Sequence, residues 1–336
     1  MLKIELKPIG EQVAVVMGAS SGIGRATALE LSAAGAKVVV AGRGEEALNS
    51  LAHEIELAGG EAVVVVADVT RFEELENVAQ VAIENFGRID TWVHTAAAAM
   101  YATFEETTPD EFKRIVDVTL TGAAWGAMVA LPHLKKSGGA LIQVSSVEAL
   151  VGIPYQSAYA SAKHGMKAYL DVLRLELERA GAPVSVTNIM PTGINTPFFN
   201  NARTKIGVKP TPPPPIYQPH IVARAIVAAA QKPIPEIVVG GGGAAFAYAK
   251  RFAPRLADWL LKPTFQLQKT DEPKSQNAPD NLDAPNTRDA RVEGDYSAQA
   301  RGTSVWTWLE THPPAKKLVS VGALGLLLWA IKRRAA

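Results

Sequence analysis

Apolar and polar positions follow two different periods along the first two-thirds of the chain. Short runs that are almost continuously apolar and rich in β-branched residues predict strands buried within a parallel sheet. Segments of helical spacing separate these runs, at about 22–34, 45–58, 71–86, 109–136, 157–180 and 219–231. The predicted strands are Val13–Met17, Lys37–Ala41, Ala62–Ala67, Thr91–His94, Ala140–Val144, Val184–Ile189 and Glu236–Val239.

Regular alternation of strands and helices predicts an α/β fold, in which helices cover both faces of one parallel sheet. Right-handed crossovers between the strands then give a doubly wound, Rossmann-like sheet. Ligands of such sheets bind outside the carboxyl ends of the strands. Residues that bind a ligand should therefore follow the predicted strands.

The pattern changes after the glycine run 240–243. One more helix is predicted over Ala244–Leu261, and residues 263–304 are then rich in Asp, Asn, Pro, Gln, Ser and Lys. Such a composition is typical of a linker or a loosely ordered tail. We expect an α/β domain over residues 1–262, a polar linker or extended tail over 263–312, and an apolar C-terminal segment over 313–336.

The last apolar run, Leu318–Ile331, is bracketed by Lys316, Lys317 and the cations at 332–334. Its 14 residues would reach roughly 21 Å as a helix, less than a ~30 Å hydrocarbon core. A short membrane anchor, an interfacial helix and a helix docked on protein all stay open, and the flanking cations favour contact with a membrane. The N-terminus lacks the apolar core of a signal peptide, which favours a cytoplasmic protein.

Composition narrows the classes of function. A net charge of +1 argues against nucleic acid as a partner. The absence of cysteine excludes disulfides, thiolate metal ligands and cysteine nucleophiles. Six scattered histidines show no metal-ligand spacing on one helix face. We therefore expect a small-molecule partner and no metal ion.

A glycine-rich segment follows the first predicted strand, with Gly18, Gly22 and Gly24 spaced G-x-x-x-G-x-G. A tight turn, a close approach of backbone to a pyrophosphate and free N–H groups at a helix start all favour glycine here. Ser20 and Ser21 add hydroxyl donors. The alternative is a strand-to-helix turn without a ligand.

The second predicted strand ends at Gly42-Arg43 without a carboxylate. Dinucleotide folds place an acidic residue there for the ribose hydroxyls of NAD, whereas an arginine accommodates the 2′-phosphate of NADP. NADP is therefore favoured over NAD, unless Arg43 is an ordinary solvated cation. Asp68, after the third strand, either accepts from the adenine amino group or caps the next helix.

Tyr159 and Lys163 are four residues apart and share one face of a predicted helix. A nearby ammonium group and an oxidised nicotinamide both lower the pKa of a phenol, which lets Tyr159 transfer a proton to or from a substrate oxygen. Ser146, at the end of the fifth strand, can polarise the same oxygen. Together with the glycine turn, this set indicates hydride transfer coupled to proton transfer.

Over residues 10–245 these motifs resemble the short-chain dehydrogenase/reductase family. The resemblance implies a single Rossmann-like domain with a sheet of seven strands, a nicotinamide cofactor, catalysis by Ser146, Tyr159 and Lys163, and a homo-oligomer. Lys163 would also bind the nicotinamide ribose, and Ile194 and Thr196 would contact the carboxamide. The full set of expected cofactor contacts is Gly18, Ser20, Ser21, Gly22, Ile23, Gly24, Arg43, Asp68, Val69, Ala96, Tyr159, Lys163, Pro191, Ile194 and Thr196.

Three features of the sequence depart from the family pattern. Thr119 stands where the family has a catalytic Asn that holds a water in the proton path, and we expect its hydroxyl to serve there. His94-Thr95-Ala96-Ala97 replaces an Asn-Asn-Ala-Gly turn, and His94 either carries protons or makes structural hydrogen bonds. Thr192 takes the second place of the family's Pro-Gly segment.

The substrate side is expected within 197–219, where Phe198, Phe199, Ile206 and Tyr217 would form an apolar lid stiffened by prolines. Tyr155 and Glu148 flank the catalytic residues and are candidates to face the substrate. The sequence thus predicts an NADP(H)-dependent oxidoreductase that interconverts a carbonyl and a secondary alcohol of an apolar substrate. The alternative is a catalytically weak NADP(H)-binding sensor or scaffold tethered at a membrane.

Overall fold

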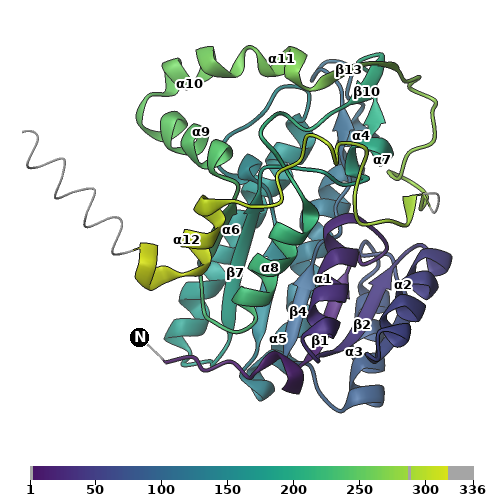
Figure 1. Cartoon of the computed structure of the whole chain (residues 1–336), viewed down its shortest axis with the longest axis vertical. Helices are drawn as coiled ribbons and strands as arrows, with labels where there is room; N and C mark the ends of the chain where they lie inside the picture. The colour runs from purple at the N-terminus through teal and green to yellow at the C-terminus, as the bar shows by residue number, and fades with distance from the viewer. Residues whose placement is uncertain (1–2, 287–288, 317–336) are drawn as a thin grey trace, which may run out of the picture.

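A parallel sheet of seven strands forms the centre of the protein, in a computed structural model that describes residues 3–286 and 289–316 (Figure 1). Every strand pairs in parallel with its neighbours. Across the sheet the strand order is β12 (Glu236–Val239), β7 (Ser185–Pro191), β6 (Ala140–Val144), β4 (Thr91–His94), β1 (Val13–Met17), β2 (Lys37–Gly42) and β3 (Ala62–Val66). The predicted strands are confirmed, with ends that differ by at most two residues.

Helices cover both faces of the sheet, as the alternating pattern predicts. One layer consists of α1 (Gly22–Ala33), α2 (Glu45–Leu57) and α8 (Pro219–Ala229). The other contains α3 (Phe72–Phe86), α4 (Pro109–Val116), the π-helical turn η2 (Asp117–Thr121), α5 (Gly122–Ser137) and α6 (Ser157–Arg179). Two hydrophobic cores result, one under each layer, because the residues of each buried strand alternate between the two faces.

The chain reverses its direction across the sheet between β1 and β4. From β1 it runs outward through β2 and β3, and from β4 it runs the other way through β6, β7 and β12. The connections that leave β1 and β4 therefore lead to opposite faces of the sheet. A crevice forms at the carboxyl ends of these strands, which is the usual ligand site of a doubly wound sheet.

The single helix predicted over Ala244–Leu261 is wrong. The segment forms two helices, α9 (Gly241–Phe252) and α10 (Pro254–Leu261), which meet at Ala253. Pro254 lacks an N–H and its ring disfavours a helical residue before it, so the first helix ends there. The short helix α11 (Thr264–Leu267) follows, and these three helices lie over the carboxyl edge of the sheet (Figure 1).

The polar stretch expected to be a linker or loose tail instead packs along the α/β domain. Strand β13 (Lys269–Pro273) pairs with β10 (Val208–Pro210). Residues 274–286 and 289–301, which we call the strap, then run across the carboxyl edge towards α12 (Val305–Thr311) beside β12 (Figure 1). The chain segment is polar because it follows the surface, and its order comes from contacts with distant parts of the chain.

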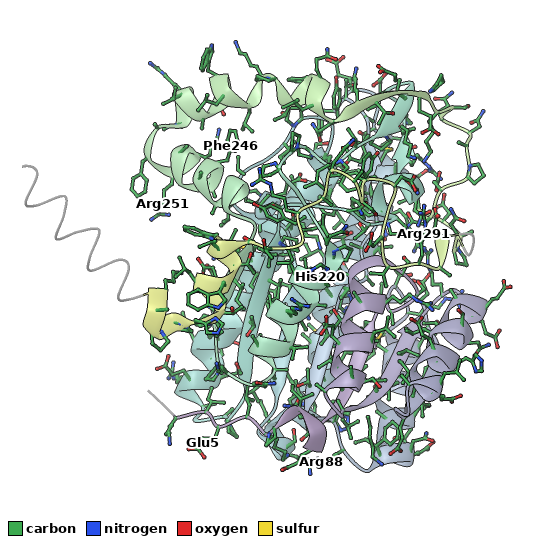
Figure 2. The ribbon with its side chains drawn as sticks, in the orientation of Figure 1. Glu5, Arg88, His220, Phe246, Arg251 and Arg291 are labelled. Atoms are coloured by element: carbon green, nitrogen blue, oxygen red, sulfur yellow. The ribbon has the colours of Figure 1, made fainter. Side chains whose placement is uncertain are left out.

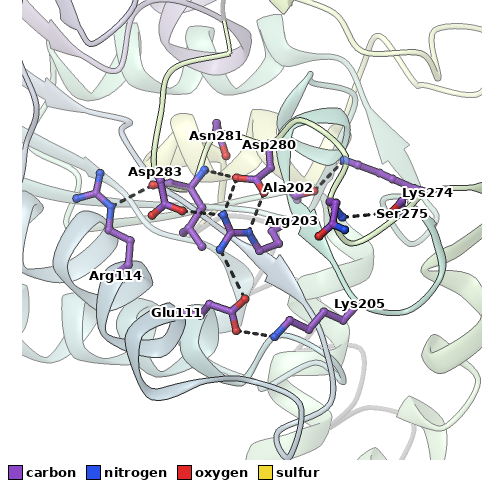
Figure 3. A network of polar contacts seen from close by, with 12 residues as sticks. Glu111, Arg114, Ala202, Arg203, Lys205, Lys274, Ser275, Asp280, Asn281 and Asp283 are labelled. Atoms are coloured by element: carbon purple, nitrogen blue, oxygen red, sulfur yellow. Dashed lines mark hydrogen bonds and ion pairs between the residues drawn. The ribbon is translucent and has the colours of Figure 1, made fainter.

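Ion pairs and backbone hydrogen bonds anchor the strap. Arg203 lies between the carboxylates of Asp280 and Asp283, with its Nε 2.8 Å from Asp280 Oδ2, and also contacts Glu111 (Figure 3). The N–H of Asn281 donates to the Asn201 carbonyl. The strap is thereby fixed to the segment that follows the helix α7 (Phe198–Asn201).

One continuous helical stretch, Pro109–Ser137, is long and apolar enough to cross a membrane by length and composition. Half of its most apolar window is buried, and it packs between α3 and α6 in the body of the protein. The apolar run 318–331, for which contact with a membrane is predicted, lies outside the described residues.

Candidate active site

A cavity of about 340 Å³ opens at the carboxyl ends of the strands. All residues predicted to contact the cofactor line it, together with Ser146. They come from the loops after β1, β2, β3, β4, β6 and β7 and from the start of α6. Parallel strands end at the same edge, which is why residues almost 180 positions apart in the sequence meet in one cavity.

The glycine turn leaves no room for side chains. Gly18 has φ +81°, and a β-carbon there would lie 2.6 Å from the backbone N of Ala96. A β-carbon on Gly24 would lie 2.1 Å from the Gly18 carbonyl oxygen. The loop after β1 is therefore in close contact with the loop after β4. Gly22 and Gly24, in the first turn of α1, line the cavity, and the N–H of Gly22 donates to the Arg291 carbonyl of the strap at 2.9 Å. This arrangement fits the pyrophosphate of a dinucleotide.

Arg43 lies at the far end of the cavity, where the adenosine half of a dinucleotide would bind. Its Nη2 donates to the carbonyl of Asn281 at 2.6 Å and its Nη1 to that of Asp283 at 3.3 Å. The strap thus orients the guanidinium group with neutral carbonyl oxygens, and the nearby carboxylates of Asp68 and Asp283 act on its charge.

Asp68 also lines the cavity, but its carboxylate is already used by the protein. It accepts from the N–H and the hydroxyl of Thr70 and pairs with Arg114 at 3.3 Å. Burial opposes ionisation of Asp68, but the bonds from Thr70 and the charge of Arg114 outweigh it and hold its pKa below the usual value. Asp68 does not cap α3, whose N-cap is Arg71.

The predicted catalytic side chains meet beside the end of β6. Lys163 Nζ donates to the Val144 carbonyl at 2.8 Å and lies 5.3 Å from the centre of the Tyr159 ring. Ser146 caps the short 3-10 helix η3 (Val147–Ala149), where its Oγ accepts from the Glu148 N–H at 3.1 Å. Because Ser146 Oγ is the acceptor of this bond, its hydroxyl proton can be donated to Tyr159 or to a ligand in the cavity.

Burial controls the pKa of both titratable catalytic groups. It raises the pKa of the Tyr159 phenol, the charge of Glu148 raises it further, and a hydrogen bond with Ser146 opposes them. The prediction of a more acidic phenol is therefore wrong for the protein without cofactor, because burial destabilises the phenolate. Burial also lowers the pKa of Lys163 to about 7, against the opposing effect of Glu148.

Thr119 is not among the residues that line the cavity. Its fully buried hydroxyl accepts from the Ala98 N–H and donates to the Ala98 carbonyl, both at 3.1 Å. This pairing ties the π-helical turn to the loop after β4 and occupies the hydroxyl that was predicted to hold a water. The structure thus gives Thr119 a structural position behind the cavity wall.

His94 is fully buried on β4, and neither ring nitrogen has a hydrogen-bond partner among the described residues. Burial lowers its pKa to about 3, and the charge of Lys163 adds to the effect. The imidazole therefore stays neutral at physiological pH. The structural hydrogen bonds proposed for it are not made in the described part of the chain.

The predicted lid is partly formed. Phe198 and Phe199 line the cavity, and the Phe198 ring lies 5.7 Å from the Tyr159 ring. Ile206 instead packs against the core, and Tyr217 is buried under the other helix layer. Tyr155 packs against Phe265 rather than facing the cavity, whereas Glu148 lines it.

Several lining residues were missed by the sequence interpretation. The strap contributes Asn281, Pro285 and Asn286 near Arg43. Helices α9–α11 add a largely apolar roof, and Phe246 and Leu261 of this roof pack on Val147 and Val151 (Figure 2). The four-residue spacing of Ala257 and Leu261 signals a buried face of α10, but no local pattern in the strap indicates that it crosses the crevice.

Comparisons with known proteins agree with this geometry. The sequence profile described as short chain dehydrogenase matches residues 12–207. An oxidoreductase of Bacillus subtilis, YxnA, is 36% identical over 342 residues that cover 99% of this chain and 93% of that protein. Trans-4-hydroxycyclohexanecarboxylate dehydrogenase of Sinomonas cyclohexanicum is 31% identical over 60% of this chain and 80% of that enzyme.

A solved structure has a similar fold. The alcohol dehydrogenase of the archaeon Thermococcus sibiricus, in complex with 5-hydroxy-NADP, superposes with a TM-score of 0.60 at 27% identity. It covers 68% of this chain and 95% of the archaeal one. The match with the B. subtilis protein, in contrast, extends through the strap.

Proposed function

Since the chain belongs to the short-chain dehydrogenase family and is an oxidoreductase of that type, we propose that it reduces a carbonyl compound with NADPH. The observation that carries the proposal is the cavity itself, which is lined by the glycine turn, by Arg43 and by the Ser146, Tyr159 and Lys163 side chains. When bound, the dinucleotide supplies the hydride.

The side chains of the protein bind the substrate oxygen and supply its proton. The Ser146 hydroxyl donates to the carbonyl oxygen and withdraws electron density from the carbon. Tyr159 gives its phenolic proton to this oxygen as negative charge develops there. Lys163, held by the Val144 carbonyl, stabilises the phenolate that remains through its positive charge.

The electrostatics favour the reductive direction. Burial and Glu148 keep the pKa of Tyr159 above its usual value, so the phenol is protonated at physiological pH and ready to donate. Oxidation of an alcohol needs the phenolate instead, which the same surroundings disfavour. We therefore assign carbonyl reduction as the preferred direction of the isolated protein.

The preference for NADPH rests on Arg43 and on the missing carboxylate at the end of β2. The archaeal alcohol dehydrogenase with a bound NADP derivative supports this preference. Asp68 is bonded to Thr70 and Arg114, and its negative charge would repel a phosphate. We therefore assign recognition of the 2′-phosphate to Arg43.

A non-catalytic NADPH sensor is the second candidate, and the buried pairing of Thr119 is the observation that favours it. Without a side chain to hold water, resupply of the Tyr159 proton would be slow. The homo-oligomer and the cytoplasmic, membrane-associated location stay predictions from the sequence.

Stopped-flow oxidation of NADPH with a panel of ketones and aldehydes tests the proposal. We expect turnover in wild type, a loss of about 10²–10⁴-fold in Tyr159→Phe, and unchanged affinity of that variant for NADPH. Tyr155→Phe is the matched control and should retain wild-type turnover, because Tyr155 lies outside the cavity wall. Tight binding of NADPH with no oxidation by any carbonyl would favour the sensor.

A further inference from the structure

Glu148 places a carboxyl group beside the reacting groups of the cavity. It lies on η3, two residues after Ser146, and its side chain lines the cavity although the residue is only 5% exposed. Its N–H holds Ser146 Oγ at 3.1 Å. The Glu148 side chain is therefore directed by the same short helix that orients the serine hydroxyl.

This carboxyl group has no protein partner. Oε2 of Glu148 is buried and accepts no hydrogen bond in the described part of the chain. Burial raises the pKa of Glu148 well above the usual value, and the charge of Lys163 opposes this only in part. In either protonation state the carboxyl group offers an unused, strong hydrogen-bond acceptor in the wall of the cavity.

A second polar group faces the same region. Tyr101, at the end of the short strand β5 (Met100–Tyr101), is 1% exposed and lines the cavity. Burial raises the pKa of its phenol, and Glu148 is near enough to raise it further. Tyr101 and Glu148 thus bring two hydrogen-bonding groups from different elements to the wall that carries Tyr159.

The rest of this wall is apolar, with Val147, Val151, Ile153 and Leu261 among its residues. An entirely apolar substrate would leave the Glu148 carboxyl group without a hydrogen-bond partner. A buried polar group without a partner is costly, and sites built around such groups reject analogues that lack the matching hydroxyl. The expected apolar substrate therefore fits this wall only in part.

We propose that Glu148 is a specificity residue that exchanges hydrogen bonds with a hydroxyl group next to the reacting carbonyl, so that the substrates are hydroxy ketones and the corresponding diols. This inference rests on the proposed carbonyl reduction. It adds a second oxygen to the substrate, beyond the one that Ser146 and Tyr159 contact.

Matched ketones and two substitutions at Glu148 test the inference. The ketones are 2-hydroxyacetophenone and acetophenone, and the variants are Glu148→Leu, which removes hydrogen bonding, and Glu148→Gln, which keeps one donor and one acceptor. We expect Glu148→Leu to lower the kcat/KM ratio of hydroxy ketone to ketone by about 10- to 100-fold. Glu148→Gln should leave that ratio within about threefold of wild type.

Val151→Ala is the control, because it changes the apolar wall and should alter kcat/KM of both ketones alike. An unchanged ratio in Glu148→Leu overturns the proposal. An equal loss of kcat/KM for both ketones in Glu148→Leu and Glu148→Gln also overturns the proposal, because Glu148 would then act through its charge or through proton transfer. NADPH affinity, measured by fluorescence, identifies any variant that fails to fold.

A binding measurement separates this inference from the reaction itself. We expect 1-phenyl-1,2-ethanediol to bind the wild-type protein with NADP at least about tenfold more tightly than 1-phenylethanol, and Glu148→Leu to abolish the difference. This preference would support the inference even if no ketone is reduced, in which case only the proposed reaction fails. Equal binding of both alcohols to wild type overturns the inference.

Discussion

The α/β domain and the strap are stabilised by different kinds of contact. In the domain, strands such as β1 are fully buried and both helix layers pack on them through apolar side chains. Among the described strap residues, Leu282 is the one apolar side chain that is buried. The strap depends instead on Arg203, Arg43 and backbone carbonyls.

This difference shows how a polar segment can be ordered without a core of its own. Its groups bond to loops that the sheet already holds in place, so the loss of chain entropy is offset by many weak contacts with a rigid surface. The strap also forms one wall of the predicted cofactor site, so the two regions meet where NADPH would bind. Substitutions in each region can measure how far the order of the strap depends on its contacts with the domain.

The largest effect is expected at Leu282. Leu282→Ala removes the buried side chain that joins the strap to the core, and we expect it to lower the free energy of unfolding by about 2–5 kcal/mol. Chemical denaturation measures the change. Leu57→Ala is the control and should have little effect, because Leu57 is 76% exposed. A loss of strap protection in hydrogen exchange without a change in global stability would mean that the two regions unfold independently.

Arg43 tests the contact between the regions. Arg43→Ala should weaken NADPH binding by about 10- to 100-fold through loss of a charge-assisted hydrogen bond, and NADH binding far less. Titration of nucleotide fluorescence gives both affinities. Lys209→Ala is the control, since Lys209 Nζ also bonds the strap, at Asp295, but lies outside the cavity wall. Equal losses for NADPH and NADH in Arg43→Ala would remove the preference for NADP.

The pH dependence of carbonyl reduction tests the role of the Lys163 charge. Burial places the pKa of Lys163 at about 7, so the ammonium form prevails below that pH and is lost above it. We expect kcat/KM for reduction to fall above pH 7, approaching about tenfold per pH unit. Lys163→Arg keeps its charge and should show lower activity without this fall. A flat profile in wild type would contradict the role of the Lys163 charge.

The smallest effect is expected from the strap's ion pairs. Asp280→Asn keeps the acceptor for the Leu282 N–H but removes the charge opposite Arg203. Because this pair is only partly buried, we expect a loss of about 0.5–1.5 kcal/mol in stability. Glu5→Gln at the exposed Lys3 pair should leave the melting temperature unchanged. A larger loss for Asp280→Asn would make the ion-pair network, rather than Leu282, the main anchor of the strap.

Local patterns of residues were enough to predict the α/β class, the strands of the sheet and the residues of the glycine turn. Each of these depends on local features: the period of apolar positions, the need for glycine at Gly18, and the four-residue spacing of Tyr159 and Lys163 on one helix. Such features act over a few residues and can be recognised before the chain folds.

The partners of several side chains could be seen only in the folded protein. Thr119 bonds to Ala98, the polar stretch packs as a strap against Arg43, and Oε2 of Glu148 has no hydrogen-bond partner among the described residues. Partners separated by tens or hundreds of residues determine these outcomes, together with burial, which reverses the expected shift in the pKa of Tyr159. Neither the identity of a distant partner nor the burial of a side chain can be recognised in a local pattern. Both depend on which surfaces meet after the sheet has formed.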